Sequence, residues 1–139
     1  MSDHQDIVDL TIAYTWALDT RQFEDLRQVF AADATAVLRG MACDGIDAII
    51  ARISKAISSL AVTQHLVGNQ QTRVDGDRAT CRTQLQAQHV RTPADGGNQF
   101  IIAGVYEDDL VRAADGWRIS HRVMRETWTF GLPTELRQG

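Results

Sequence analysis

The side chains best suited to acid–base chemistry in this sequence are two histidines and one aspartate, His65, His89 and Asp19. A histidine takes up and releases protons near neutral pH, and a neighbouring carboxylate orients its ring and stabilises its charged form. Either histidine alone is better explained as a packed ring with hydrogen-bonded nitrogens. Two inward histidines together with an inward carboxylate favour a general base, because a buried charge needs a partner.

Asp19 has two interpretations of equal weight. It follows apolar residues at the C-terminal end of a predicted helix, where the helix dipole disfavours negative charge. One interpretation is that it caps a second helix, because its spacing to Gln22 matches a capping box. The other is that it is a catalytic carboxylate. Tyr14, on the core-facing stripe of the same helix, is either a core residue or a hydroxyl donor to the same space.

Strand alternation indicates which of the other candidates face inward. In residues 78–91 apolar and polar residues alternate, and His89 falls on the apolar face, which we expect to point inward. The face that His65 occupies in its own strand is ambiguous from the pattern. Arg122 is a candidate cation near the site, but alternation places it opposite Trp117. A β-bulge would therefore be needed to turn Arg122 inward.

Helical periodicity comes first in the chain and strand periodicity follows. Helical spacing runs through residues 7–18, 19–30 and 44–60, the last opened by Asp44 as a plausible N-cap, and residues 35–38 form a short strand. Four long strands are predicted at residues 63–74, 78–91, 99–112 and 117–130. This order predicts an α+β fold: a cone-shaped barrel of a curved, mainly antiparallel sheet, with three N-terminal helices enclosing a pocket.

The composition is that of one globular domain. The 139 residues are 44% hydrophobic and 23% charged, so we expect a single domain over residues 1–139. The net charge of −4 and the scattered basic residues argue against a nucleic-acid partner. The acidic N-terminus is unlike a signal peptide and no run of 18 apolar residues occurs, so we expect a cytoplasmic protein with no membrane partner.

No cofactor or metal motif accompanies these residues. Cys43 and Cys81 have no metal-binding spacing and are expected to be buried thiols. The acidic run 107–109 is expected to be a solvated strand end rather than a metal cluster. A glycine-rich phosphate loop and a G-x-S-x-G nucleophile motif are both missing from the sequence. We therefore predict a site that requires no metal ion and no cofactor.

Several short phrases are typical of one family. They are ALDTR followed by Phe23, then VFAADA, GIDAI, TQH and DGWRI, at residues 17–23, 29–34, 45–49, 63–65 and 115–119. Together with the order of the elements, they resemble the SnoaL-like branch of the nuclear-transport-factor-2-like superfamily over nearly the whole chain. The resemblance implies a cone-shaped α+β barrel with a deep pocket, in agreement with the fold predicted from periodicity.

The site pattern is similar to that of scytalone dehydratase. Asp19 matches its catalytic aspartate, and His65 and His89 match its two catalytic histidines. Two pocket positions differ, because Leu18 stands where that enzyme has a tyrosine and Tyr106 falls at the position of a pocket asparagine. The resemblance implies catalytic roles for the aspartate and the two histidines, and a substrate-binding position for Tyr106.

Other members of the superfamily suggest assisting residues. Hexachlorocyclohexane dehydrochlorinase has an aspartate–histidine dyad matching Asp19 and His65, and an arginine that falls on Arg122. Bile-acid 7α-dehydratase has a tyrosine, aspartate, histidine and arginine set that looks like these three residues with Tyr14. Ketosteroid isomerase shares the tyrosine, but its catalytic aspartate would fall near Leu38. The resemblance therefore argues against that isomerase mechanism.

Taken together, these resemblances imply a cofactor-independent, dehydratase-like lyase acting on a small, mostly apolar cyclic hydroxylated substrate. His65 would take a proton from carbon, Asp19 would stabilise the imidazolium, and His89 would protonate the leaving hydroxyl. Tyr14 or Arg122 would stabilise negative charge on an oxygen. The alternatives are a noncatalytic ligand-binding or accessory subunit of the same fold, and a polyketide cyclase or isomerase. The mixed polar and aromatic outer face of the strands predicts a homodimer or higher homo-oligomer.

Overall fold

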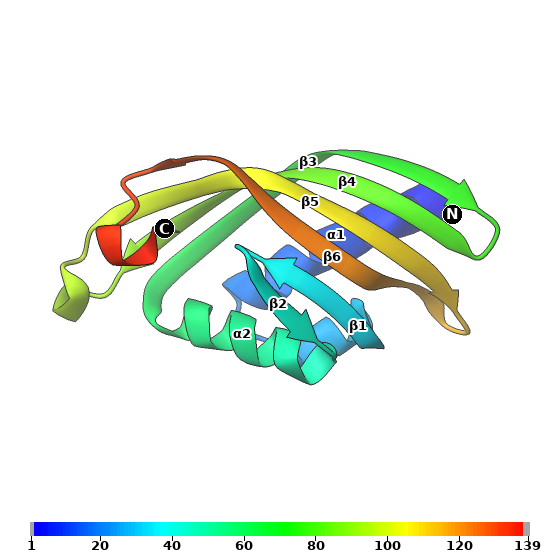
Figure 1. Ribbon diagram of the computed structural model, residues 1–139, viewed down its shortest axis with the longest axis horizontal. Coiled ribbons are helices and arrows are strands. Elements are labelled where there is room, and N and C mark those ends of the chain that lie inside the picture. The colour runs from blue at the N-terminus through cyan, green and yellow to red at the C-terminus, as the bar shows by residue number, and fades with distance from the viewer. Residues whose placement is uncertain (1, 138–139) are drawn as a thin grey trace.

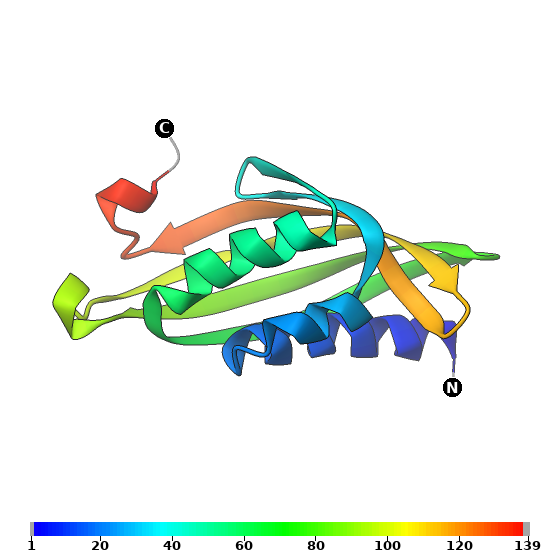
Figure 2. The same cartoon turned by 90° about the horizontal axis from the view of Figure 1, so that it is seen from below.

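One curved six-stranded sheet forms a layer of the protein, and two α-helices cover one of its faces (Figures 1 and 2). The computed structural model describes residues 2–137. In chain order the elements are α1 (Asp3–Asp19), the 3-10 helix η1 (Phe23–Gln28), β1 (Phe30–Leu38), β2 (Met41–Asp44), α2 (Ile46–Ser58), β3 (Leu60–Asp75), β4 (Arg78–Arg91), the 3-10 turn η2 (Pro93–Asp95), β5 (Gln99–Ala113), β6 (Gly116–Phe130) and the 3-10 turn η3 (Thr134–Leu136).

The predicted α+β class is confirmed. The strand order is β2-β1-β6-β5-β4-β3, and every neighbouring pair is antiparallel except β1 and β6, which are parallel. All four predicted long strands are present, as β3 to β6. The sheet does not close into a barrel, because β2 and β3 are its two edges. Figure 2 shows α1 and α2 against the same face of the sheet.

The N-terminal elements differ from the prediction in three details. The second predicted helix is only the short η1, and Phe30 begins β1 instead of continuing a helix. The reason is that residues 34–38 are buried at alternate positions, which suits a strand paired with β6. Helix α2 begins after Gly45 without a side-chain cap, so Asp44 is not its N-cap. Asp44 instead ends β2, a strand that the periodicity did not predict.

Apolar side chains from both layers fill the space between the sheet and the helices. Every second residue of β4 from Ala79 to His89 is buried, which confirms the predicted alternation. The two cysteines are buried and free, as expected. None of the helices in residues 2–137 is long and apolar enough to cross a membrane. Helix α2 contributes four buried isoleucines, Ile46, Ile49, Ile53 and Ile57.

A β-bulge in β6 decides the direction of Arg122. Ile119 and His121 pair with consecutive residues of β5, so Ser120 is an extra residue in β6. The insertion changes the phase of the alternation, and both Trp117 and Arg122 are buried on the inner face. The bulge that an inward Arg122 requires is therefore present.

Candidate active site

The C-terminal end of α1 is fixed against the start of β3 by Arg21. This residue follows the helix in a left-handed conformation, with φ of 58°. Its guanidinium donates hydrogen bonds to the carbonyl oxygens of Ile57 at 3.0 Å and Leu60 at 2.6 Å. These two carbonyls lie near the end of α2 and at the beginning of β3. Arg21 thus joins three elements immediately beside Asp19, and sequence patterns gave no sign of this long-range contact.

Asp19, the last residue of α1, accepts three hydrogen bonds from β3. Its Oδ1 lies 2.7 Å from the ring Nδ1 of His65 and accepts the hydroxyl of Thr63 at 2.9 Å. Its Oδ2 accepts the backbone N–H of His65 at 2.7 Å. The N-cap of η1 is Gln22, and no side chain caps that helix. The capping interpretation of Asp19 is therefore wrong, and its carboxylate belongs to the dyad.

The contacts of Asp19 keep its carboxyl group ionised. Burial raises the pKa of Asp19, but the hydrogen bonds from His65 and Thr63 outweigh it and hold the pKa below its ordinary value. An ionised carboxylate beside Nδ1 favours the His65 tautomer with its proton on that nitrogen. The lone pair on Nε2 is then free to accept a proton. The His65 side chain, only 6% exposed, lines a cavity of the protein, so the dyad has the arrangement of a general base.

His89 lies on the inner face of β4 beside the dyad, as predicted. Its ring stacks on Phe100 with centroids 4.4 Å apart, and it meets the His65 ring edge-on at 6.1 Å. Burial lowers the pKa of His89 to about 4, and a proton on the neighbouring His65 ring acts in the same direction. His89 is therefore a neutral ring at neutral pH, and its buried Nδ1 has no hydrogen-bond partner within residues 2–137.

Two tyrosines enclose a buried ion pair next to the cavity. Nε and Nη2 of Arg122 donate to the two carboxylate oxygens of Asp108 at 2.7 and 2.8 Å. The guanidinium lies 4.3 Å from the ring centroid of Tyr14 and 4.0 Å from that of Tyr106. Asp108 is thus a buried partner, and the prediction that it belongs to a solvated strand end is wrong. The alternation of β5 contains the missed signal, because Asp108 lies between two buried residues of the inner face, Tyr106 and Leu110.

The cavity itself combines polar and apolar walls. It has a volume of about 110 Å³, and His65, His89, Tyr14 and Tyr106 all line it. Burial raises the pKa of both tyrosines, so both are neutral phenols that can donate hydrogen bonds. Asp19 lies behind the histidine, and Arg122 lies behind the tyrosines without lining the cavity. Apolar wall residues are Leu18, Leu38, Ile53, Ile57, Leu85, Ile102 and Met124.

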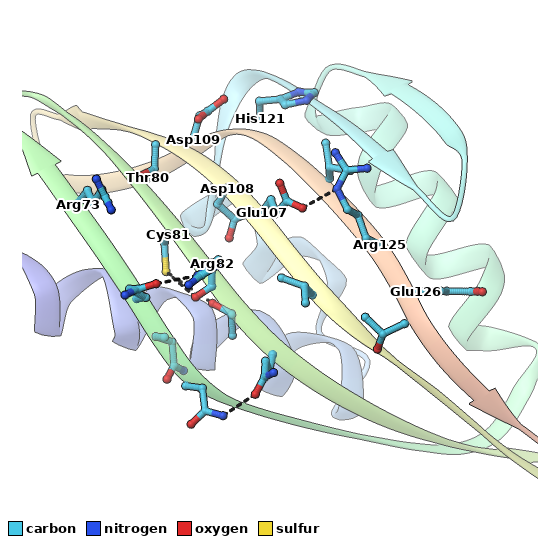
Figure 3. A pocket seen from close by; sticks show the side chains of 18 residues that line it. Arg73, Thr80, Cys81, Arg82, Glu107, Asp108, Asp109, His121, Arg125 and Glu126 are labelled. Atoms are coloured by element: carbon cyan, nitrogen blue, oxygen red, sulfur yellow. Dashed lines mark hydrogen bonds and ion pairs between the residues drawn. The ribbon is translucent and has the colours of Figure 1, made fainter.

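A second, larger hollow occupies the sheet face away from the helices. It has a volume of about 1230 Å³ and is lined mainly by polar residues of β3 to β6. Figure 3 shows Arg125 and Glu107 directed toward one another across it, where they form an ion pair. Its histidine, His121, is hydrogen bonded to Thr35 at 2.7 Å. The Asp19–His65 pair lies at the smaller cavity and not at this hollow, so the smaller cavity is the candidate site.

No group of three or more His, Cys, Asp or Glu side chains within residues 2–137 has an arrangement that could hold a metal ion.

The residues that the sequence predicted as the site come together around one cavity: Asp19, His65, His89, Tyr14, Tyr106 and, one layer further out, Arg122. Sequence reasoning missed Arg39 and Arg52, which also line the cavity. Arg39 lies in the turn between β1 and β2, and Arg52 lies on a flank of α2.

The fold and site define a small α+β protein with an aspartate–histidine pair at the wall of a cavity beneath a curved sheet. The chain belongs to the SnoaL-like domain family, whose sequence profile matches residues 1–123. Its curated relatives include an uncharacterized protein of Mycobacterium tuberculosis and another of Mycobacterium bovis. Each is 38% identical over 128 residues, which cover 88% of this chain and 84% of the relative.

Solved structures with the same fold include named lyases. A Kribbella flavida protein superposes with a TM-score of 0.86, at 24% identity and with 93% of each chain covered. A Novosphingobium aromaticivorans protein assigned as a scytalone dehydratase has a TM-score of 0.84 at 23% identity, covering 94% of this chain and 87% of its own. A hexachlorocyclohexane dehydrochlorinase of Novosphingobium barchaimii has a TM-score of 0.81 at 19% identity, covering 94% and 90%. At these identities the likeness establishes the fold.

Proposed function

We propose that this protein is a cofactor-independent lyase that eliminates water, or another small leaving group, from a small cyclic hydroxylated substrate. The observation that carries the proposal is the Asp19–His65 contact of 2.7 Å at the wall of a mostly apolar cavity. An ionised aspartate on one ring nitrogen leaves the other nitrogen as a base toward the cavity. The names of two structural neighbours, a dehydratase and a dehydrochlorinase, support the same class of reaction.

The elimination begins at a carbon beside a carbonyl group. Nε2 of His65 takes the proton from that carbon, and the electron pair of the C–H bond moves toward the carbonyl oxygen to form an enolate. Asp19 stabilises the imidazolium that results. The enolate then re-forms the carbonyl, a C=C bond is made, and the C–O bond to the leaving hydroxyl breaks. The proton held by His65 passes to this hydroxyl, so the products are an unsaturated ketone and water.

The other polar groups of the cavity have supporting roles in this proposal. The phenols of Tyr14 and Tyr106 donate hydrogen bonds to the enolate oxygen, and the charge of Arg122 behind them stabilises the negative charge that develops there. His89 is neutral, so we assign it to holding the leaving hydroxyl by a hydrogen bond, with the proton supplied from His65. Its unpartnered Nδ1 is available for such a contact.

The test is turnover of a panel of cyclic β-hydroxyketones in D₂O by the wild type and by His65→Gln. We expect growth of the enone absorption and deuterium incorporation at the proton-donating carbon, with both rates reduced roughly 10²- to 10⁴-fold in the variant. The matched control is His4→Gln, which should keep wild-type rates because His4 contacts Thr72 on the surface.

Two outcomes would overturn the proposal in favour of its alternatives. If panel members bind without exchange or elimination, the protein is a noncatalytic ligand-binding member of the fold. If His65 is needed but the product contains a new carbon–carbon bond and no water is lost, the protein is a cyclase.

A further inference from the structure

The cavity that holds His65 has arginine side chains in its wall, although the chain as a whole has a net charge of −4. Two arginines, Arg39 and Arg52, line it, and within residues 2–137 none of the lining residues is an aspartate or a glutamate. Asp19 does not line the cavity, and its carboxylate is hydrogen bonded to His65. A neutral apolar substrate gives no role to a guanidinium group in the wall of its binding cavity unless that group has a partner within the protein.

The two arginines differ in their partners. Arg39 forms an ion pair with Glu126 and donates to the carbonyl oxygen of Leu136 at 2.9 Å. Arg52 forms no ion pair with any residue that the structure describes, and its Nε is buried without a hydrogen-bond partner. Cys43 lies close enough to sense the Arg52 charge, but burial raises the pKa of that thiol, which therefore supplies no counter-charge at neutral pH.

Arg122 shows, in the same protein, which group binds the edge of a guanidinium formed by Nε and Nη2. The Nε and Nη2 groups of Arg122 bind both oxygens of one carboxylate. Arg52 has a buried Nε on the equivalent edge, and a buried donor without an acceptor costs about 1–3 kcal/mol. A planar carboxylate matches this edge with two parallel hydrogen bonds. The missing partner of Arg52 is thus best supplied by a ligand.

The size of the cavity limits the body of that ligand. The volume is about 110 Å³, somewhat below the roughly 150 Å³ of a cavity that admits benzene, so the cavity holds no more than one ring, part of which lies in its open mouth. We propose that the natural ligand is a single-ring carboxylic acid whose carboxylate binds Arg52 while its ring lies between the apolar walls. That the ring carbon facing His65 then reacts rests on the proposed function. The inference narrows the substrate class from apolar cyclic compounds to small cyclic acids.

Benzoate, benzamide and benzamidine test this inference, because they share one shape and differ in charge. Their binding to the full chain is measured by calorimetry and by NMR shifts of the histidine rings. We expect benzoate to bind about tenfold more tightly than benzamide, and benzamidine to bind most weakly. Arg52→Met keeps the apolar stem and should bring benzoate and benzamide within about twofold of each other. Arg78→Met, an exposed arginine in the β4 hairpin end, is the control that keeps the preference.

The outcomes separate this inference from the proposed function. Equal binding of benzoate and benzamide to the wild type, or a benzoate preference that survives in Arg52→Met, overturns the anion site whatever the turnover. His65→Gln should keep the benzoate preference while it loses turnover. A benzoate preference that depends on Arg52, without exchange or elimination of any panel compound, supports the anion site and refutes the lyase.

Discussion

The ring and the backbone amide of His65 both contact the carboxylate of Asp19, one on each oxygen, at 2.7 Å. The same carboxylate therefore orients the histidine ring and fixes the strand that carries it. Because α1 supplies the aspartate and β3 the histidine, the dyad is also a joint between the helical layer and the sheet edge.

We expect Asp19→Asn to reduce both activity and stability. An amide cannot accept from every donor that surrounds the carboxylate, so a buried donor loses its partner and the free energy of unfolding falls by about 1–3 kcal/mol. The loss of negative charge also removes the stabilisation of the imidazolium. The corresponding aspartate-to-asparagine change in a serine protease lowered the rate ~10⁴-fold. Turnover and thermal unfolding at pH 7 measure the two effects. Near-parental turnover would remove Asp19 from the mechanism.

The depressed pKa of His89 predicts a stability that falls with acidification. The unfolded chain binds a proton at this residue near pH 6.5 and the native chain near pH 4, so between these values the unfolded state binds more protons. The contribution of neutral His89 to the free energy of unfolding is fully present above pH 6.5. It falls by at most about 3 kcal/mol as the pH is lowered toward 4. Asp19, with a lowered pKa, contributes stability that is lost only at lower pH.

Denaturant unfolding between pH 7 and pH 4.5 checks this expectation. His89→Asn should lose most of the slope of stability against pH, while His4→Gln keeps it. An unchanged slope in His89→Asn would show that other groups set the acid sensitivity of the protein.

The sheet was predictable from the sequence, because strict alternation and clear turn signals mark β3 to β6. The direction of His89 followed from the same alternation. The pairing of Asp19 with His65 came from the family resemblance, since no local pattern places a helix end against a strand 44 to 46 residues away. The face of His65 became definite only when that contact supplied the missing constraint.

The positions and contacts of the arginines could not be predicted from local sequence patterns, for a physical reason. Arg52 lies on the flank of α2, between the buried isoleucine stripe and solvent, where a helical pattern is equally consistent with an exposed side chain. Arg21 acts on carbonyls 36 and 39 residues away, and a backbone acceptor has no sequence signature. The sequence predicted that Arg122 points inward only if β6 contains a bulge. The bulge itself could not be predicted, because it depends on the register between β5 and β6.

We propose that the protein forms a homodimer, or a higher homo-oligomer, through the outer face of the sheet. Leu66, Gln86, Ala103 and Trp128 are successive cross-strand partners in one row over β3 to β6, and the side chains at its two ends are 62% and 46% exposed. Phe130, in the next row, is 73% exposed. Apolar surface beside the charged hollow of Figure 3 suits a mixed interface with a second copy.

Sedimentation at micromolar concentration should give at least twice the monomer mass of 15.4 kDa. Trp128→Lys should shift the protein toward monomer. Trp16→Lys replaces a tryptophan that is 65% exposed on α1 and should leave the mass unchanged. A monomeric wild type, or dissociation by Trp16→Lys alone, would contradict the sheet-face interface.

The Arg122–Asp108 pair should behave as one buried unit. Burial lowers the pKa of Arg122, but the neighbouring carboxylate outweighs it and raises the pKa above the ordinary value, so the cation persists inside the core.

Arg122→Met leaves Asp108 as a buried charge without its partner, and we expect a loss of roughly 3–5 kcal/mol in unfolding free energy. The double variant Arg122→Met with Asp108→Leu removes both charges and should be more stable than the single variant. Chemical unfolding of the double variant and of both single variants, Arg122→Met and Asp108→Leu, beside the wild type gives the coupling, and additive losses would mean that the two side chains stabilise the fold independently. In the double variant, turnover should remain below wild type even where stability recovers, because no positive charge then lies behind Tyr14 and Tyr106.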